Sequence, residues 1–246
     1  MQNNKLQDDE IEYEKNQNFN KLVAWLHTNR YNNILNIFDE LSASDEAKTI
    51  HVIDIGCAHG KLFSILKDKY KISYIGIELN SEFVKTAEER YKKYSNFKII
   101  QGAAENYLTK LANVDIVVAL ETLEHIPEHI VVRIVEEIAK ANPRFFVSSV
   151  PVEIGPAIWF KNIGSLMAGY MRHNEYSWKE TFWAGLGSLD KLPPHDTGHK
   201  GFDWRWLAQT IRHNMKIREI RKFPFSFLPA ALSTSVFFVA ESRLDE

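Results

Sequence analysis

Apolar and polar residues alternate along the chain with two periods, and the switch between them predicts the fold. Between residues 22 and 38 the apolar positions mostly recur at helical spacing, which predicts one or two leading helices. From Ile50 onward, short apolar runs alternate with amphipathic stretches. The expected strands are Ile50 to Ile55, Ser73 to Glu78, Phe97 to Gln101, Val114 to Leu120 and Arg144 to Val150. The expected helices between them are Lys61 to Tyr70, Ser81 to Tyr94, Ala104 to Ala112 and Pro127 to Ala141.

Strands separated by helices of this length are joined by parallel crossovers. After a further expected helix, Phe202 to Asn214, two more apolar runs cover Lys216 to Phe223 and Ser235 to Glu241. Only a turn-rich stretch separates these runs, so we expect them to pair antiparallel. The sequence therefore predicts an α/β fold with a doubly wound, seven-stranded, mostly parallel sheet.

The period breaks after the fifth expected strand. Residues 151–201 contain seven glycines, four prolines and many aromatic residues. This segment is too irregular for another β-α unit and too apolar for a disordered linker, so we interpret it as an inserted cap. The expected organisation is an N-terminal helical extension (1–48), a cofactor-binding core (49–151), the cap (152–200) and a C-terminal part that completes the core sheet (201–246).

Composition narrows the function classes. Of 246 residues, 45% are apolar and 25% are charged, as in an ordinary globular protein, and the net charge of −2 gives nucleic-acid binding no support. A single cysteine, Cys57, excludes an internal disulfide framework and a multi-cysteine metal site. With no signal-peptide pattern and no apolar run of spanning length, we expect a cytoplasmic protein. Peripheral contact with a membrane surface is compatible with this composition, and the sequence predicts no particular oligomeric state.

The stretch "DIGCAHG" lies between the first expected strand and the first helix of the core. At that corner of a doubly wound sheet, Gly56 and Gly60 let the backbone approach a ligand closely. Glu78 ends the second strand, 22 residues after Gly56, where a carboxylate can accept hydrogen bonds from ribose hydroxyls. A nicotinamide site would have glycine in place of Ala58, and a pyrophosphate would be repelled by Asp54. A cofactor with an ammonium or sulfonium group suits that acid better.

Three motifs in order, "VIDIGCAHG", "YIGIELN" and "VDIVVALETLEHIPE", resemble those of the class I S-adenosylmethionine-dependent methyltransferases. The resemblance covers about residues 50–150 and implies a Rossmann-like methyltransferase fold. It implies that S-adenosylmethionine is bound by Asp54, Gly56, Cys57, Gly60, Glu78, Leu79, Ala103, Ala104, Leu120 and Glu121. Many relatives have "GDAE" after the third strand, where this chain has "GAAE". Since Ala103 cannot bind the adenine amine, backbone groups, Leu79 or Glu105 must recognise adenine.

The end of the fourth strand bears on the acceptor. The Asp/Asn-Pro-Pro-Tyr/Phe motif of many N-methylating relatives is absent. The stretch "LETLEHIP" resembles O-methyltransferases of small molecules, including those of ubiquinone synthesis. It also resembles the small-RNA 3′-terminal 2′-O-methyltransferases, where two glutamates and two histidines bind a divalent metal. Glu121, Glu124 and His125 match three of those ligands, and His199 in "GHKGFDW" offers the fourth.

Three roles compete for these residues. We rank His199 or His125 as the base or acceptor-positioning group first, a purely structural role second, and metal ligation third. The favoured interpretation is O-methylation of a small-molecule or glycan-like acceptor, beneath a cap whose aromatic residues could roof a pocket. The alternatives are a metal-dependent RNA 2′-O-methyltransferase and a protein that binds S-adenosylmethionine without catalysis.

Overall fold

The computed structural model describes residues 21–43, 48–110, 113–159, 161–162, 176–195, 197–223, 227 and 229–243. The chain divides into two compact units, residues 1–104 and 105–246. Strand order is β3-β2-β1-β4-β5-β7-β6 in a seven-stranded sheet, the order of the class I methyltransferase fold. The predicted fold class is therefore confirmed. No helix of the described ranges is both long and apolar enough to cross a membrane.

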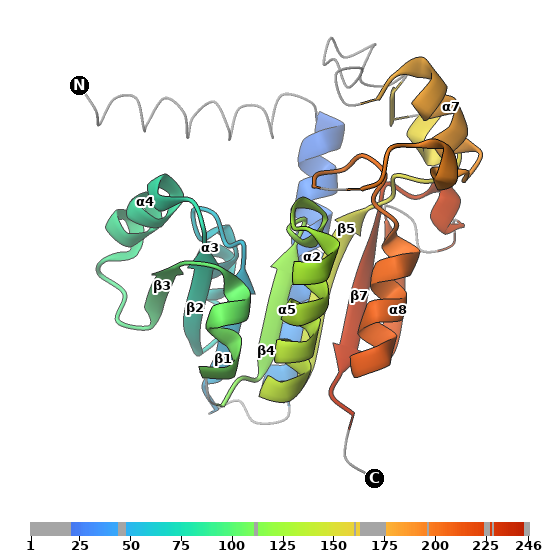
Figure 1. Cartoon of the computed structure of the whole chain (residues 1–246). Helices are drawn as coiled ribbons and strands as arrows, with labels where there is room; N and C mark the ends of the chain where they lie inside the picture. Colours follow the sequence, from blue (N-terminus) through green and yellow to red (C-terminus); the bar gives the residue numbers. More distant parts are fainter. Residues whose placement is uncertain are drawn as a thin grey trace. The chain divides into compact units, whose positions relative to one another are not determined.

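The first unit is a three-stranded parallel sheet with helices (Figure 1). Its elements are α2 (Lys21–Ala43), β1 (Ile50–Ile55), α3 (Lys61–Leu66), β2 (Ile72–Glu78), α4 (Ser81–Tyr91) and β3 (Phe97–Gln101). Aromatic rings fill its core: Phe63 lies 4.9 Å from Tyr91 and 4.8 Å from Phe97 between ring centroids. At Gly60, whose φ is 73°, an added Cβ would lie 2.8 Å from Cε2 of Tyr91. The glycine thus lets the β1–α3 loop close against this core.

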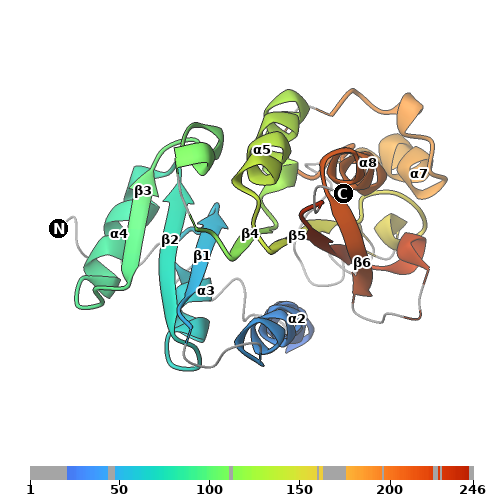
Figure 2. The same cartoon turned by 90° about the horizontal axis from the view of Figure 1, so that it is seen from below.

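The second unit is a four-stranded mixed sheet in which α5 and α8 pack side by side (Figure 2). β4 and β5 are parallel, whereas β7 is antiparallel to both β5 and β6. The antiparallel pairing expected for the last two strands is therefore confirmed. The unit's elements, after η1 (Ala104–Asn106) at its boundary, are η2 (Leu108–Lys110), β4 (Ile116–Leu120), η3 (Leu123–His125), α5 (Glu128–Ala141), β5 (Phe145–Pro151), α7 (Trp178–Gly185), η5 (Leu189–Lys191), α8 (Trp204–Asn214), β6 (Lys216–Phe223), η6 (Ala230–Leu232) and β7 (Ser235–Glu241).

Several expected helices differ from the structure: α4 ends at Tyr91 and not at Tyr94, and α8 begins at Trp204 and not at Phe202. α3 ends at Leu66, four residues earlier than predicted, and Tyr70 turns away to hydrogen-bond the Leu35 carbonyl and Asp39 of α2. In place of the helix Ala104 to Ala112 there are two short 3₁₀ turns, η1 and η2, and residues 111–112 lie outside the described ranges. The amide of Lys110 bonds the Tyr107 carbonyl three residues back, the 3₁₀ pattern.

The segment predicted as a cap has a small core of its own. Ile158, Tyr176, Ala184 and Leu192 are buried together, and Trp159 packs against them. By contrast, Trp178, Phe182 and Trp183 of α7 are 73%, 53% and 37% exposed. Two further aromatic residues of the segment 152–200, Phe160 and Tyr170, lie outside the described residues. The aromatic residues of this segment thus divide into a packed group and an exposed group.

Candidate functional site

The β1–α3 loop of the first unit is a tight turn held by backbone hydrogen bonds. The amide of Gly56 donates to the Ile77 carbonyl (2.8 Å), and the amide of Gly60 donates to the Cys57 carbonyl (2.8 Å). Gly56 and Ala58 have φ of 68° and 45°, so the turn runs through left-handed backbone. A non-glycine residue is uncommon in that region, and such strain concentrates at ligand sites.

The Glu78 carboxylate links the end of β2 to the loop that follows β1. Its Oε2 accepts a hydrogen bond from the Ala58 amide (3.0 Å), and its Oε1 accepts one from the Asn80 amide (2.8 Å). A carboxylate has about four lone-pair sites, so Glu78 can still accept bonds from two further hydroxyls. Beside it, Leu79 is an exposed apolar side chain, 66% accessible, that offers a flat ring a contact surface. Glu78 and Leu79 therefore fit the ribose and adenine parts expected of the cofactor.

Asp54 is the buried acid of β1. It is 5% exposed, and the hydroxyl of Tyr74 in β2 donates a hydrogen bond to its Oδ2. Burial raises the pKa of Asp54 to about 7; the nearby charge of Glu78 adds to this rise, and the Tyr74 hydrogen bond opposes it. A positively charged ligand group close to Asp54 would favour its ionised form. Tyr74 was not predicted as a site residue, because a tyrosine in a buried strand has the pattern of a core residue.

The remaining cofactor candidates are small or buried residues. Cys57 is 5% exposed, its Sγ occupies the space that Gly76 leaves open, and burial raises the pKa of its thiol far above the usual range. Ala104 is 6% exposed and Ala103 is partly exposed. These side chains shape the first unit without offering charge to a ligand.

In the second unit, β4 ends at Leu120 and the next residue, Glu121, has φ of 48°. The Glu121 amide donates to the carbonyl of Ser149 in β5 (2.8 Å), and the Ser149 hydroxyl donates to Glu121 Oε1 (3.0 Å). Left-handed backbone at a non-glycine residue costs on the order of 1–3 kcal/mol and persists where the surroundings enforce it. This strained strand end is the geometry expected beside a ligand site.

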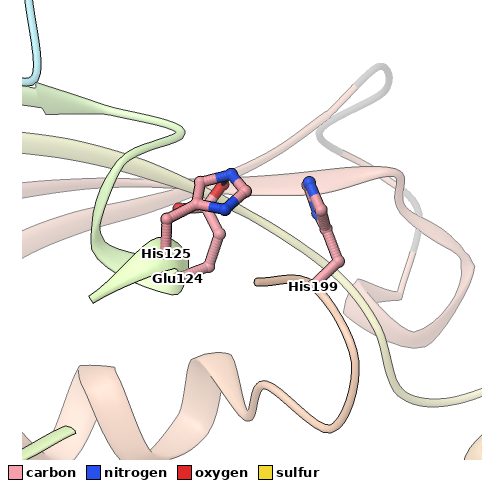
Figure 3. Close-up of side chains that lie close together, drawn as sticks. All are labelled: Glu124, His125 and His199. Carbon is pink, nitrogen blue, oxygen red and sulfur yellow. Dashed lines mark ion pairs between the residues drawn. The ribbon is translucent and has the colours of Figure 1, made fainter. Parts of the chain in front are cut away.

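Glu124, His125 and His199 come together in this second unit (Figure 3). One ligand-type atom from each lies within 4.8 Å of the others. Glu124 is fully buried, and its Oε1 lies 3.8 Å from Nε2 of the half-exposed His125. The rings of His125 and His199 meet edge to face with centroids 4.9 Å apart. The two histidines predicted to act on the acceptor are thus neighbours, with a buried carboxylate beside them.

The loop that carries His199 is fixed by contacts on both sides. Tyr176, which is buried, accepts a hydrogen bond from the Gly201 amide (2.9 Å) and donates one to the His199 carbonyl (3.4 Å). Lys200 pairs with Glu180 of α7 (2.7 Å), an interaction that lowers the Glu180 pKa to about 2. Asp203 then caps α8 by accepting from the Arg205 amide. His199 therefore occupies a defined position ahead of α8.

Sequence reasoning missed Glu153. This acid is fully buried directly after β5, and its Oε1 lies 4.0 Å from Nδ1 of His199. Lys161 donates to the same oxygen (3.2 Å) and to the Val152 carbonyl (2.8 Å). A signal was present in "SVPVEIGP", where one acid follows three apolar residues, Val150 to Val152, since an acid among buried residues needs a partner.

Comparisons with known proteins agree with this fold. Residues 52–142 match a family model described as a methyltransferase domain. No curated protein sequence gives a significant match. Among solved structures, the methyltransferase domain of bacterial CtHen1 is 17% identical with a TM-score of 0.60, covering 88% of this chain and 98% of that one.

Two further structures show the range of acceptors on this fold. Magnesium protoporphyrin IX methyltransferase from Synechocystis PCC 6803, solved with bound SAH, is 16% identical with a TM-score of 0.57, covering 91% of this chain and 88% of that one. The N-methyltransferase NodS from Bradyrhizobium japonicum is 13% identical with a TM-score of 0.52, covering 88% of this chain and 96% of that one. At such identities the likeness establishes the fold and leaves the acceptor to the chemistry of the site.

Proposed function

We propose that this S-adenosylmethionine-dependent methyltransferase transfers the methyl group to a hydroxyl oxygen, and that Glu124, His125 and His199 bind and activate that hydroxyl. The observation that carries the proposal is the group of two imidazoles and one buried carboxylate within 4.8 Å. A hydroxyl is a weak nucleophile that must lose its proton during transfer, and imidazole is suited to take it near neutral pH.

We propose separate roles for the residues that bind the cofactor and for those that act on the acceptor. When bound, S-adenosylmethionine would supply a methyl group attached to a positively charged sulfur. Transfer of that methyl to the acceptor oxygen breaks the bond to sulfur and leaves the sulfur as a neutral thioether. Asp54 and Glu78 would hold the cofactor's charged and ribose groups, while His199 or His125 accepts the hydroxyl proton. Much of the rate enhancement then comes from orientation of the two reactants.

A second mode of activation, by a divalent cation, ranks below the first but is compatible with the donor set. One carboxylate oxygen and two imidazole nitrogens are ligand types suited to divalent first-row metals, and their separations permit a shared ion. A bound cation would lower the pKa of the acceptor hydroxyl, so that no protein base need be strong. Among the described residues Glu121, expected from the sequence as a further ligand, does not join this group; its Oε1 accepts a hydrogen bond from the Ser149 hydroxyl.

The acceptor we favour is a small-molecule or glycan-like hydroxyl. The exposed aromatic residues of α7, Trp178, Phe182 and Trp183, are suited to stack on a sugar ring or a hydrophobic group.

We also propose four parts of the chain: an N-terminal extension (1–48), a cofactor-binding core (49–151), a cap (152–200) and a C-terminal part that completes the core sheet (201–246). The cap should show slower hydrogen exchange when cofactor and acceptor are both present, and unchanged exchange in an active sample would refute that role.

The second candidate acceptor is a ribose 2′-hydroxyl of RNA, which the carboxylate and histidine group supports together with the likeness to CtHen1. One experiment separates the candidates. The protein is incubated with methyl-labelled S-adenosylmethionine and either hydroxylated sugars, phenols or RNA with a 3′-terminal diol, and product masses are measured. We expect one added methyl on a hydroxyl of the sugar or phenol set; labelled RNA would favour the second candidate. Labelled nitrogen or carbon would refute O-methylation.

A further inference from the structure

A buried acid, Glu153, lies beside the ring of His199. The Glu153 side chain is 1% exposed, and its Oε1 lies 4.0 Å from Nδ1 of His199, itself a buried atom. We infer that Glu153 is a positioning residue: it accepts a hydrogen bond from Nδ1–H of His199 and so leaves Nε2 as the nitrogen that acts on the acceptor. The inference rests on the proposed function in so far as His199 belongs to the acceptor site.

The separation suits such a role. At 4.0 Å the two atoms are beyond hydrogen-bond length, but catalytic hydrogen bonds are often long before ligands bind and shorten in the reacting complex. The His199 side chain is 31% exposed although its Nδ1 is buried, so the accessible part of the ring lies elsewhere. An acceptor arriving from solvent therefore meets the other side of the ring, where Nε2 is the available nitrogen.

Lys161 is the cationic partner of the buried Glu153 side chain. Burying an ionised carboxylate is costly unless a partner of opposite charge accompanies it. The Lys161 ammonium supplies that partner at 3.2 Å and is anchored by the Val152 carbonyl at 2.8 Å. The pair has no place in the core cluster of the cap, which consists of apolar residues and Tyr176. We therefore assign to the buried Glu153–Lys161 pair the role of orienting His199.

Glu153 would fix the tautomer of the histidine. A neutral imidazole carries one proton, and the nitrogen facing an anion is the one that holds it. With the proton on Nδ1, Nε2 has the lone pair needed either to accept a hydroxyl proton or to bind a cation. The same tautomer thus serves both modes of activation. Tyr176 fixes the main chain of the loop through separate bonds, so that the ring and the backbone of His199 are held independently.

The direct test is the tautomer itself, measured by NMR of ¹⁵N-histidine-labelled protein without cofactor, at a pH where the imidazole signals are those of the neutral ring. Comparison with His199→Ala identifies the His199 signals. We expect the Nδ1–H tautomer in wild type and a shift towards Nε2–H in Glu153→Gln. A wild-type ring protonated on Nε2, or identical tautomers in the two proteins, would overturn the inference. The wild-type measurement decides the matter even if the variant does not fold.

A double-mutant cycle supplies the kinetic test. Glu153→Gln should lower kcat by about 10- to 100-fold and leave the affinity for S-adenosylmethionine unchanged. This is the typical effect of removing the carboxylate that orients a functional histidine. In a His199→Ala background the same change should lower kcat no further, because its effect passes through the ring. An equal additional loss there would mean a merely structural role. Full activity of His199→Ala would instead refute the role of His199 in the proposed function and leave the tautomer result standing.

Discussion

The carboxylate of Glu78, at the end of β2, accepts a hydrogen bond from the backbone amide of Ala58 in the β1–α3 loop (3.0 Å). This bond makes one residue both a support of the loop and the expected holder of the cofactor ribose. Glu78→Ala removes both functions, so S-adenosylmethionine binding should weaken by about 1–3 kcal/mol. Isothermal calorimetry measures the loss, and Glu82→Ala on α4 is the matched control. Equal affinities of Glu78→Ala and wild type would remove Glu78 from the site.

Asp54 predicts a pH dependence of cofactor binding. Burial raises its pKa to about 7 in the free protein, and a ligand ammonium or sulfonium favours the ionised form. Affinity should therefore rise with pH up to about 7, by at most about tenfold per unit, and level off above. Binding below pH 7 should also release a proton, measurable by calorimetry in buffers of different ionisation enthalpy. Methylthioadenosine, which has no charged group, is the control ligand; an equal slope for it would contradict a role for Asp54.

The same raised pKa acts on stability in the opposite direction. The unfolded carboxyl titrates near its ordinary value of about 3.9, so between about pH 4 and pH 7 the folded state binds more protons than the unfolded state. The contribution of Asp54 to stability is thus fully present below about pH 4 and is lost as pH rises through 7. Ionised Asp54 therefore favours cofactor binding at neutral pH but lowers the folding stability of the ligand-free protein there.

Most of the fold follows from the sequence, because its strands are short apolar runs between clear helices. β1, β3, β6 and β7 have the predicted bounds, since glycine, proline or charged residues mark their ends. α3 was predicted four residues too long; the Tyr70 hydroxyl at the end of the predicted helix instead bonds the Leu35 carbonyl of α2, which is far away in sequence. Local periodicity cannot encode such a contact.

The site was only partly predictable. The "LEHIP" histidine and the histidine of "GHKGFD" were singled out by residue type, and the structure brings their rings together. Glu153 was missed because its partners, Lys161 and His199, lie 8 and 46 residues away. Tyr74 was missed because a tyrosine that binds Asp54 and one that only packs against Phe63 give the same sequence pattern.

The small core of the cap predicts a stability effect at Gly185. A Cβ added there would lie 1.8 Å from Nε1 of Trp159, which is held in place by its hydrogen bond to the Thr181 carbonyl (3.1 Å). Gly185→Ala should therefore destabilise the protein by about 1–3 kcal/mol and lower Tm by several degrees. Differential scanning calorimetry checks this, with the exposed Lys179→Ala as control. A Tm equal to that of the control would contradict this packing of Trp159.

The grouped Glu124, His125 and His199 allow the second mode of activation, by a divalent cation, to be tested without any acceptor. If that mode applies, titration of the chelator-treated protein with Mn²⁺ should show one site, lost in His199→Ala and retained in His213→Ala, a change of an exposed histidine on α8. Absence of binding in wild type would remove cation activation. It would leave the histidines as bases, with activity insensitive to chelator.

The most direct measurement of the central claim is the single-turnover rate of methyl transfer to a hydroxyl acceptor in His199→Ala, compared with wild type and with His213→Ala. If His199 activates the hydroxyl, its loss should slow transfer by about 10²- to 10⁴-fold while calorimetry shows nearly unchanged S-adenosylmethionine affinity, and His213→Ala should match wild type. A wild-type rate in His199→Ala would contradict a role for His199 in activating the hydroxyl.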